Sequence, residues 1–385
     1  MYGGRVDNAQ DDRLLNTYLQ QYFSSAMLSP SSARGSIRLA PGVTLPTSNS
    51  HSAYTELISQ LPPQDTPSLF GLPANSDVAV QQRSASYVQD NLRQLSSDPE
   101  AAGKFDRDKW AAQLTPILTL WAQLAQQCEP LKEMRARRPS QGGTPVDTII
   151  ALEIFKAKQL LNLVDDSTAA IGRVVRGTEL LDARTKSQGN ALVQGTVPST
   201  WSDLWEGPVK PDAWMKAAAT RIVALGRWQQ SASAGTLLRE PLRLSELLSP
   251  SFFLTALRQQ TARQAKVPMD SLRLSSALES QLLGSASLRV QIDGLLLQGA
   301  ACAPPQGLHP LPADAPTFAA MPPLHVAWVP METPDPYPAD RSALLPLYLD
   351  PEREVQLGEL RLPCSGTEAS WLQAGAALFL SGAEL

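Results

Sequence analysis

The histidines are the first residues to consider for chemistry, because catalytic bases and zinc sites most often use them. The sequence has three, His51, His309 and His325, which lie far apart along the chain. None belongs to an HExxH pattern or stands at another spacing that zinc sites use. The histidines therefore favour neither a metal centre nor a catalytic dyad.

Nucleotide-binding loops are also absent from the sequence. A phosphate-binding loop needs GxxxxGK followed by Ser or Thr, yet the only Gly-Lys pair, Gly103-Lys104, has Asp98 where the first glycine is required. Neither GxGxxG nor a GxSxG nucleophile elbow occurs. We therefore expect no cofactor in this segment.

Adjacent carboxylates and the cysteines are the remaining candidates for chemistry. Asp165 and Asp166 are neighbours on a predicted helix, where they point about 100° apart, so we interpret them as a solvated surface. Cys128, Cys302 and Cys364 are widely spaced and odd in number, which indicates a reducing compartment without a disulfide framework. No histidine or basic cluster adjoins Cys364 to lower its pKa. We predict no catalytic, cofactor-binding or metal-binding residue, and no enzymatic activity.

Composition bounds the class of protein. The chain has 385 residues with 43% hydrophobic content and a net charge of −4, which is typical of a soluble globular protein with roughly two or three compact units. The weak acidity argues against nucleic-acid binding. The sequence has no run of about 18 apolar residues, so it predicts no membrane span. The start, Met1 followed by Tyr-Gly-Gly, has no signal-peptide pattern and looks like a cut inside a longer chain.

Before residue 247, the apolar residues follow the period of helices. Asp7 or Asn8 could cap a first helix, and residues 29–52, rich in Ser, Pro and Gly, predict an exposed loop. Four prolines predict irregular structure over 61–77, and Pro116 should kink or divide its helix. The further predicted helices span residues 53–61, 79–95, 105–128, about 145–182 with a continuation to 194, and 213–230.

Two features of this helical part have rival interpretations. Trp201, Trp205 and Trp214 lie close together and could line a binding groove, but core packing is favoured because large aromatic side chains dominate burial energy. The basic residues 135–143 could bind an anion, but charged residues beside a loop are more often simply solvated.

Residues 247–274 mark the change from helices to strands. Ser249 is expected to cap a helix that Pro250 begins, and Val267-Pro268 should end it. Its first half carries an apolar stripe, Phe253, Leu254 and Leu257, and its second half is basic, with Arg258, Arg263 and Lys266.

Short strands are expected after residue 274. Fourteen of the 32 prolines fall between Pro304 and Pro363, a density that excludes long helices and places proline at edges and turns. Strand candidates are residues 288–292, 295–297, 324–329, 344–349, 355–362 and 376–380. We predict an α+β fold in which a multi-helix N-terminal and central part is followed by a small antiparallel β-barrel.

Six blocks, spread in order from residue 2 to residue 380, resemble the C-terminal end of a dynein heavy chain. They are Tyr2–Asn8 with Asp12-Arg13-Leu14-Leu15, Thr66–Asn75, Val197–Trp201, Pro250–Ala256, Gly294–Ala300 and Trp371–Leu380. Three stretches, SLFGLPAN, FLTALRQQTAR and GAALFL, look most like the cytoplasmic type 2 heavy chains of intraflagellar transport. One departure is residues 244–248, where many dyneins carry Trp and Gly.

The resemblance implies three parts. Residues 1–50 would end the sixth AAA+ module and form a linker, residues 51–274 would be the helical part of the C-terminal domain, and residues 275–385 its β-barrel. It implies a non-catalytic cap on the AAA+ ring that modulates a minus-end-directed microtubule motor, in cytoplasm, cytoskeleton and cilium. An autonomous barrel that binds a ligand or peptide is the alternative.

The resemblance also implies the partners. They would be the AAA+ ring of the same heavy chain and the subunits of a dynein complex, with microtubules bound only through parts of the heavy chain outside these residues. ATP and Mg²⁺ would belong to the parent motor, and neither nucleic acid nor membrane is expected. Arg258, Arg263 and Lys266 become candidate ring contacts, with ordinary solvation as the equal alternative.

Overall fold

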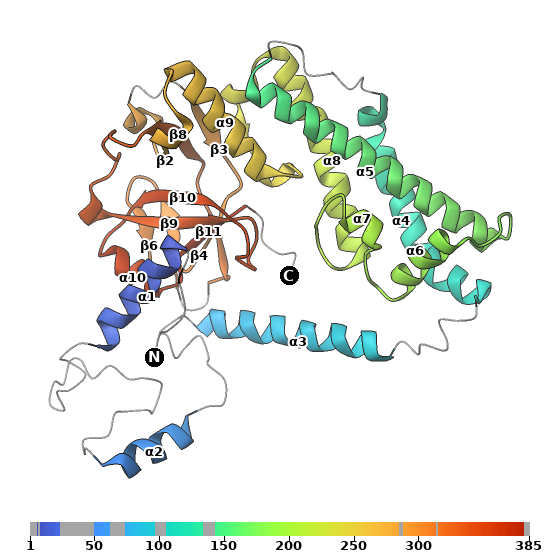
Figure 1. Ribbon diagram of the computed structural model, residues 1–385, viewed down its shortest axis with the longest axis horizontal. Coiled ribbons are helices and arrows are strands. Elements are labelled where there is room, and N and C mark those ends of the chain that lie inside the picture. The colour runs from blue at the N-terminus through green and yellow to red at the C-terminus, as the bar shows by residue number, and fades with distance from the viewer. Residues whose placement is uncertain are drawn as a thin grey trace.

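The structure, a computed structural model, describes residues 6, 8–23, 50–61, 74–96, 105–133, 143–284, 288–312 and 315–380. Most of the loop predicted over 29–52, most of residues 61–77 and 135–143, and Gly103-Lys104 lie outside the described residues. Figure 1 shows two lobes, one of helices and one of sheets, above a separate long helix.

The helical lobe is built on three long helices that pack against one another, α4, α5 and α8. Its elements are α4 (Arg107–Glu133), α5 (Pro145–Arg176), α6 (Ala183–Val193), α7 (Ser199–Ser202) and α8 (Pro211–Ala234). The expected division at Pro116 is absent, because α4 continues through it. Pro116 lies on the exposed side, where water can satisfy the carbonyl that proline leaves without a partner.

Helix α5 begins where expected and ends earlier than predicted. Thr144 accepts the Asp147 backbone N–H and Asp147 accepts the Thr144 N–H, a complete capping box. The helix stops at Arg176 because Gly177 takes the left-handed conformation, with φ 75°. The predicted end near residue 182 is therefore wrong, and Asp182 instead caps α6.

The tryptophans of the helical lobe are core residues, so the core-packing interpretation is confirmed. Trp201 and Trp214 are fully buried with ring centroids 5.5 Å apart, and Trp205 lies 5.5 Å from Trp214 on the other side. Trp214 Nε1 donates to the Trp205 carbonyl at 3.3 Å, so the polar atom of its ring is satisfied within the core.

Three helices precede the lobes: α1 (Ala9–Tyr22), α2 (His51–Gln60) and α3 (Ala74–Ser96). The expected cap at Asn8 is confirmed, since its side chain accepts the Gln10 N–H at 2.8 Å. Helix α1 packs on the sheet lobe, whereas α3 runs apart from both lobes in Figure 1.

The sheet lobe consists of short strands in three sheets. The orders are β1-β3-β8-β2, β10-β9-β11-β4-β7 and β5-β6. The strands are β1 (Pro241–Leu242), β2 (Leu272–Ala277), β3 (Arg289–Ile292), β4 (Leu296–Gln298), β5 (Ala301–Ala303), β6 (Gly307–His309), β7 (Phe318–Ala320), β8 (Leu324–Pro330), β9 (Ser342–Tyr348), β10 (Gln356–Pro363) and β11 (Ala377–Phe379), and the helix α10 (Glu368–Gln373) precedes the last.

The predicted α+β fold with a small antiparallel β-barrel is wrong, because the fold combines helices with open sheets. Among the described residues, each large sheet has an unpaired edge strand at both ends. The edge strands β2 and β10 are not paired by a backbone ladder, although the side chain of Ser276 in β2 donates a hydrogen bond to the Arg361 carbonyl in β10 at 2.8 Å. Pro330 and Pro363 end their strands, since proline donates no ladder hydrogen bond. Two of the strand pairs, β1 with β3 and β9 with β11, are parallel.

One hydrophobic core runs through both lobes. A single cluster of buried residues extends from Trp110 in α4, through Phe253, to Leu378 in β11 and Leu380 beyond it. Strand β1, which follows the last helix of the helical lobe, joins the first sheet beside β3. The two lobes are therefore parts of one packed body. Within the described ranges, none of the helices has the length and apolarity needed to cross a membrane.

Candidate coupling site between the two lobes

Helix α9 (Pro250–Ala265) lies between the lobes and contacts both. Figure 1 shows it over the sheet lobe with one end against α5. Pro250 stands at the first helical position as predicted, and the stripe of Phe253, Leu254 and Leu257 is buried. Because α9 contacts α5 on one side and β8 on the other, it is the element that joins the lobes.

The segment that leads into α9 is held by side chains of α5. The expected cap at Ser249 is wrong, since its side chain makes no capping hydrogen bond. Glu153 of α5 contacts the segment that leads into α9, where its Oε2 accepts the Leu248 N–H at 2.6 Å. Ser249 Oγ instead accepts a hydrogen bond from Lys156 Nζ at 3.1 Å. A side chain of α5 thus satisfies a buried backbone donor two residues before α9 begins.

The start of α5 is held from α9 in return. The Val146 N–H donates to Gln260 Oε1 at 3.4 Å, and both residues are buried. Gln260 lies in the second half of α9, while Glu153 contacts Leu248 just before the helix begins, so the two helices run antiparallel. We call the hydrogen bonds Glu153–Leu248 and Gln260–Val146 the reciprocal clamp.

The basic half of α9 divides into an internal and an exposed part. Arg258 Nε donates to the Met269 carbonyl at 2.9 Å and its Nη2 to the Leu272 carbonyl at 3.2 Å. Its guanidinium also lies over the Trp328 ring, 5.1 Å from the centroid. Arg258 therefore positions the turn into β2, whereas Arg263 and Lys266 are exposed.

Glu153 gives the clamp a predicted pH dependence. Its side chain is buried, and burial raises the pKa of the carboxyl against the opposing effects of the Leu248 N–H, Lys156 and Ser249. A raised folded-state pKa contributes stability below the unfolded pKa and loses it as the pH rises through the folded value. Glu153→Gln keeps an acceptor without the charge, so it should gain stability relative to the wild type between about pH 4 and pH 7.

Urea denaturation at both pH values measures this difference. Glu153→Ala provides the comparison, since it leaves the Leu248 N–H without an acceptor and should be about 1–3 kcal/mol less stable than Glu153→Gln at both pH values. Parallel stability curves for the wild type and Glu153→Gln would contradict the predicted titration.

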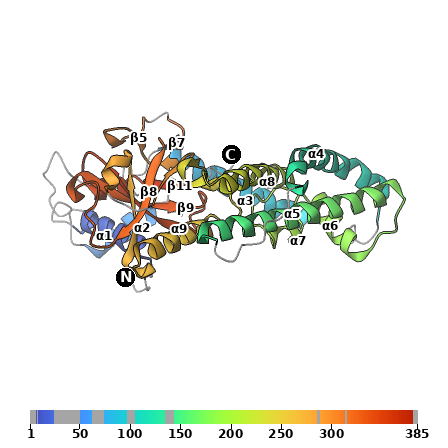
Figure 2. The same ribbon diagram turned by 90° about the horizontal axis from the view of Figure 1, so that it is seen from above.

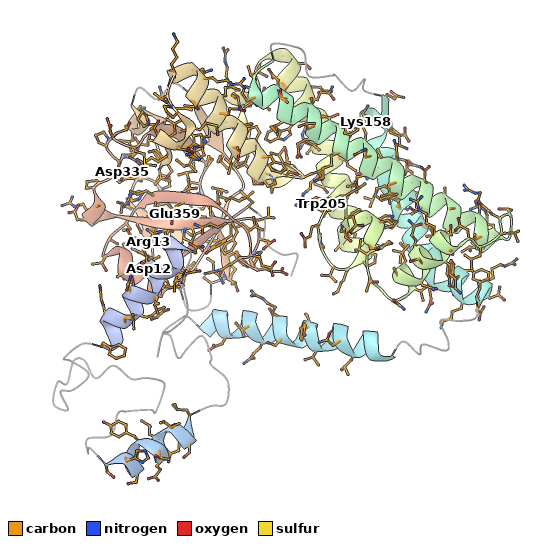
Figure 3. The ribbon with its side chains drawn as sticks, viewed as in Figure 1. Asp12, Arg13, Lys158, Trp205, Asp335 and Glu359 are labelled. Carbon is orange, nitrogen blue, oxygen red and sulfur yellow. The ribbon has the colours of Figure 1, made fainter. Side chains whose placement is uncertain are left out.

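A second contact ties α1 to the sheet lobe. Arg13 of α1 donates from Nη2 to Glu359 of β10 at 2.6 Å and from Nη1 to Glu368 of α10 at 3.0 Å, and Figure 3 shows Arg13 beside Glu359. All three side chains are less than a third exposed. Asn8 Nδ2 also donates to Gln356 Oε1 at 2.9 Å. These bonds fix the angle at which α1 meets the sheets.

The candidates for chemistry are not brought together. Asp165 accepts from Trp121 Nε1 at 2.7 Å and pairs with Lys132 at 2.6 Å, so its interpretation as a solvated residue is wrong, while Asp166 is exposed. Asp165 links α5 to α4. Burial raises the pKa of the Cys128 thiol to about 11, which disfavours the reactive thiolate.

The remaining cysteines and the histidines are also separated. Burial raises the pKa of Cys302 to about 11 and raises that of Cys364. His51, His309 and His325 belong to α2, β6 and β8. Among the residues that the structure describes, no group of three or more His, Cys, Asp or Glu side chains could hold a metal ion.

Sequence reasoning missed Glu153, Gln260 and Arg13. Glu153 had a signal, because it interrupts the apolar face formed by Ile150, Ile154 and Ala157, and a buried carboxylate requires a partner. Gln260 and Arg13 had no such signal in the sequence around them. Their partners, Val146 and Glu359, lie 114 and 346 residues away.

Comparisons with known proteins match two consecutive parts of the chain to family models. The model of the dynein heavy chain AAA lid domain matches residues 1–76, and that of the C-terminal domain of the dynein heavy chain matches residues 81–380. Helix α1, with Arg13, therefore falls in the lid match, and Glu359 falls in the C-terminal match.

Several curated proteins are similar over almost the whole chain. Cytoplasmic dynein 2 heavy chain 1 of Tripneustes gratilla is 42% identical over 383 residues, that of Chlamydomonas reinhardtii 37% over 401, and that of Homo sapiens 36% over 381. Each alignment covers 99% of this chain and 9% of the relative. The chain thus spans about 9% of the length of these relatives.

Proposed function

The chain belongs to the dynein heavy chain family, and from this premise we propose that it caps the AAA+ ring and modulates motor activity. The observation that carries the proposal is the attachment of the lid helix α1 to the sheet lobe through Arg13. A lid is part of an AAA module, so a body fixed to the lid moves when that module changes shape.

The path of coupling follows the contacts. Arg13 joins α1 to β10, and the single hydrophobic core joins β10 to α9. The reciprocal clamp and the apolar stripe then join α9 to α5. Close-packed cores transmit displacement because they deform little, so movement of the lid would reach the far end of the helical lobe.

The proposed role is non-catalytic. The sequence lacks a phosphate-binding loop, and we assign ATP and Mg²⁺, like microtubule binding, to parts of the heavy chain outside these residues. The proposed partners are the AAA+ ring of the same heavy chain and other subunits of a dynein complex. By its likeness to cytoplasmic dynein 2 heavy chains, we place it in retrograde intraflagellar transport, in the cytoplasm, cytoskeleton and cilium.

Loss of Arg13 tests the proposal in the full heavy chain. Arg13→Ala should change velocity or run length roughly two- to fivefold and leave basal ATP hydrolysis unchanged, because partly exposed ion pairs contribute modestly. Single-molecule motility and a steady-state ATPase assay measure the two quantities.

Arg173→Ala is the matched control, since it removes an ion pair with Glu179 at the far end of the helical lobe. If Arg13→Ala behaves like this control in motility, or if it abolishes basal hydrolysis, the modulating role is wrong.

A further inference from the structure

One hydroxyl that precedes a proline differs from the others that the structure describes. The described residues of this kind are Thr115, Thr144, Ser249 and Thr333. The first three are engaged, by the Ala111 carbonyl, the Asp147 carboxylate and the Lys156 ammonium group respectively. Within the described part of the chain, the hydroxyl of Thr333 has no hydrogen-bond partner. Thr333 is therefore the described site at which a Thr-Pro hydroxyl is free to react.

Thr333 lies in the exposed loop between β8 and β9. Met331 is 60% exposed, and Glu332 and Pro334 are also exposed. The Thr333 N–H donates to the Pro330 carbonyl at 2.9 Å, so the chain turns directly after β8. Proline has no N–H and disfavours the helical conformation of the residue before it. Thr333 is thus held outside regular structure, where a modifying enzyme can reach it.

An arginine lies beside Thr333. Arg273 of β2 donates from Nη2 to the Thr333 carbonyl at 2.6 Å, and its Nη1 pairs with Asp335. A phosphate on the Thr333 hydroxyl would bring about two negative charges close to this guanidinium. Guanidinium groups bind phosphate oxygens through two parallel hydrogen bonds. Arg273 is therefore placed to bind a phosphorylated Thr333.

Arg273 is also one end of a chain of ion pairs that reaches the lid helix. Asp335 pairs with Arg273 and, at 3.3 Å, with Arg361 of β10. Glu368 pairs with Arg361 at 4.0 Å and with Arg13 of α1 at 3.0 Å. None of these side chains is more than 33% exposed, so water screens their charges only partly. We call these five residues the charge chain.

The figures place both ends of the charge chain in the same lobe. Figure 2 shows α1 and β8 at one end of the molecule, away from α4 and α6. Figure 3 shows Asp335 and Arg13 on the same side of the sheet lobe. A change of charge in the loop after β8 can therefore act on the attachment of α1 without passing through the helical lobe.

We propose that Thr333 is a phosphorylation site for a proline-directed protein kinase and that its phosphate tightens the attachment of α1. The Thr333 oxygen attacks the γ-phosphorus of ATP held by the kinase and forms a new P–O bond. The bond from that phosphorus to the bridging oxygen breaks, ADP leaves, and the hydroxyl proton passes to the catalytic aspartate of the kinase. This inference rests on the proposed function, because it names a regulator of the same attachment.

The phosphate strengthens and weakens successive pairs of the charge chain in alternation. It draws Arg273 away from Asp335, and Asp335 then binds Arg361 more closely. Arg361 in turn withdraws from Glu368, a contact that at 4.0 Å is already the longest of the charge chain. Glu368 is left to Arg13 alone. The Arg13–Glu368 pair becomes stronger, and α1 is held more firmly on the sheet lobe.

Phosphorylation of the purified full heavy chain tests the site. The protein is incubated with a mitogen-activated protein kinase and Mg-ATP, and phosphopeptides are mapped by mass spectrometry. We expect phosphate on Thr333, with roughly tenfold lower occupancy at Thr115 and Thr144, whose helical hydroxyls are reached only by local unfolding. Thr333→Ser should still be modified at this position, whereas Thr333→Ala should not. An unmodified Thr333, or occupancy at Thr115 equal to it, would overturn the proposal.

Hydrogen exchange tests the action of the phosphate along the charge chain. In the phosphorylated heavy chain, the backbone amides of Ala9–Tyr22 should exchange about two- to fivefold more slowly than in the unmodified protein, since partly exposed ion pairs contribute modestly. Arg361→Gln interrupts the charge chain and keeps a polar side chain, so phosphorylation of this variant should leave the exchange of α1 unchanged. Unchanged or faster exchange in the phosphorylated wild type, or equal slowing in Arg361→Gln, would contradict the proposal.

Failure of this inference is distinguishable from failure of the proposed function. If Arg13→Ala alters motility while Thr333 takes no phosphate, modulation stands and the regulatory site is wrong. If phosphate on Thr333 slows the exchange of α1 while Arg13→Ala moves like its control, the regulatory site stands and modulation through the lid helix is wrong.

Discussion

Replacing Phe253 with alanine should destabilise the folded protein by about 3–5 kcal/mol. The ring is fully buried in α9 and meets Trp228 of α8 edge-on, with centroids 5.4 Å apart. Its removal opens a cavity at the point where the helical lobe and the sheet lobe share their core. Surrounding side chains collapse only partly around such a cavity, so the loss exceeds the transfer energy of the ring.

The adjacent phenylalanine is the control. Phe252→Ala removes the same atoms from a side chain that is 62% exposed, so its free energy of unfolding should change by less than about 1 kcal/mol. Denaturant titrations of the wild type and both variants measure the two values. Equal destabilisation by the two substitutions would show that the ring of Phe253 is not a core residue.

Gly299→Ala should cost about 2–4 kcal/mol, the second large effect. Gly299 follows β4 with φ 73°, a conformation in which a side chain is strained. A Cβ there would lie 2.4 Å from the Ala374 carbonyl oxygen and 2.8 Å from the Ala376 nitrogen. Backbone atoms cannot rotate away as a flexible side chain can, so the segment after α10 would have to move.

Gly195→Ala separates the two causes. Gly195 has the same positive φ, at 75°, but nothing lies within 4 Å of the position of its Cβ. It should therefore lose only the conformational term, about 1–2 kcal/mol. Thermal unfolding of the two variants compares them, and equal losses would mean that the close approach at Gly299 is relieved at no cost.

Local patterns predicted the helices well and long-range partners poorly. Pro250 and the stripe of Phe253, Leu254 and Leu257 defined α9 because helix initiation and amphipathicity depend on nearby residues. The cap failed because Ser249 Oγ instead accepts a hydrogen bond from Lys156 of α5, 93 residues earlier in the chain. The sequence pattern suggested Arg258 as a candidate ring contact and did not reveal its partners within the chain. These are the backbone carbonyls of Met269 and Leu272, in the segment that follows α9.

The sheets show the same limit more strongly. Strands β8, β9 and β10 fall close to their predicted positions because short apolar runs bounded by turn residues are local signals. Strand β2 was missed, since its sequence LRLSSA is short and ends in three small residues, which give a weak strand pattern. Whether a sheet closes depends on the pairing of its edges, and nothing in the pattern of Leu272–Ala277 or Gln356–Pro363 specifies that pairing.

The reciprocal clamp has a mechanical consequence. Sliding α9 along α5 by one helical turn, about 5.4 Å, would separate Glu153 from Leu248 and Gln260 from Val146 in the same movement. Both hydrogen bonds therefore resist the same sliding movement. The register of α9 on α5 is thus fixed at two points, one at each end of the contact.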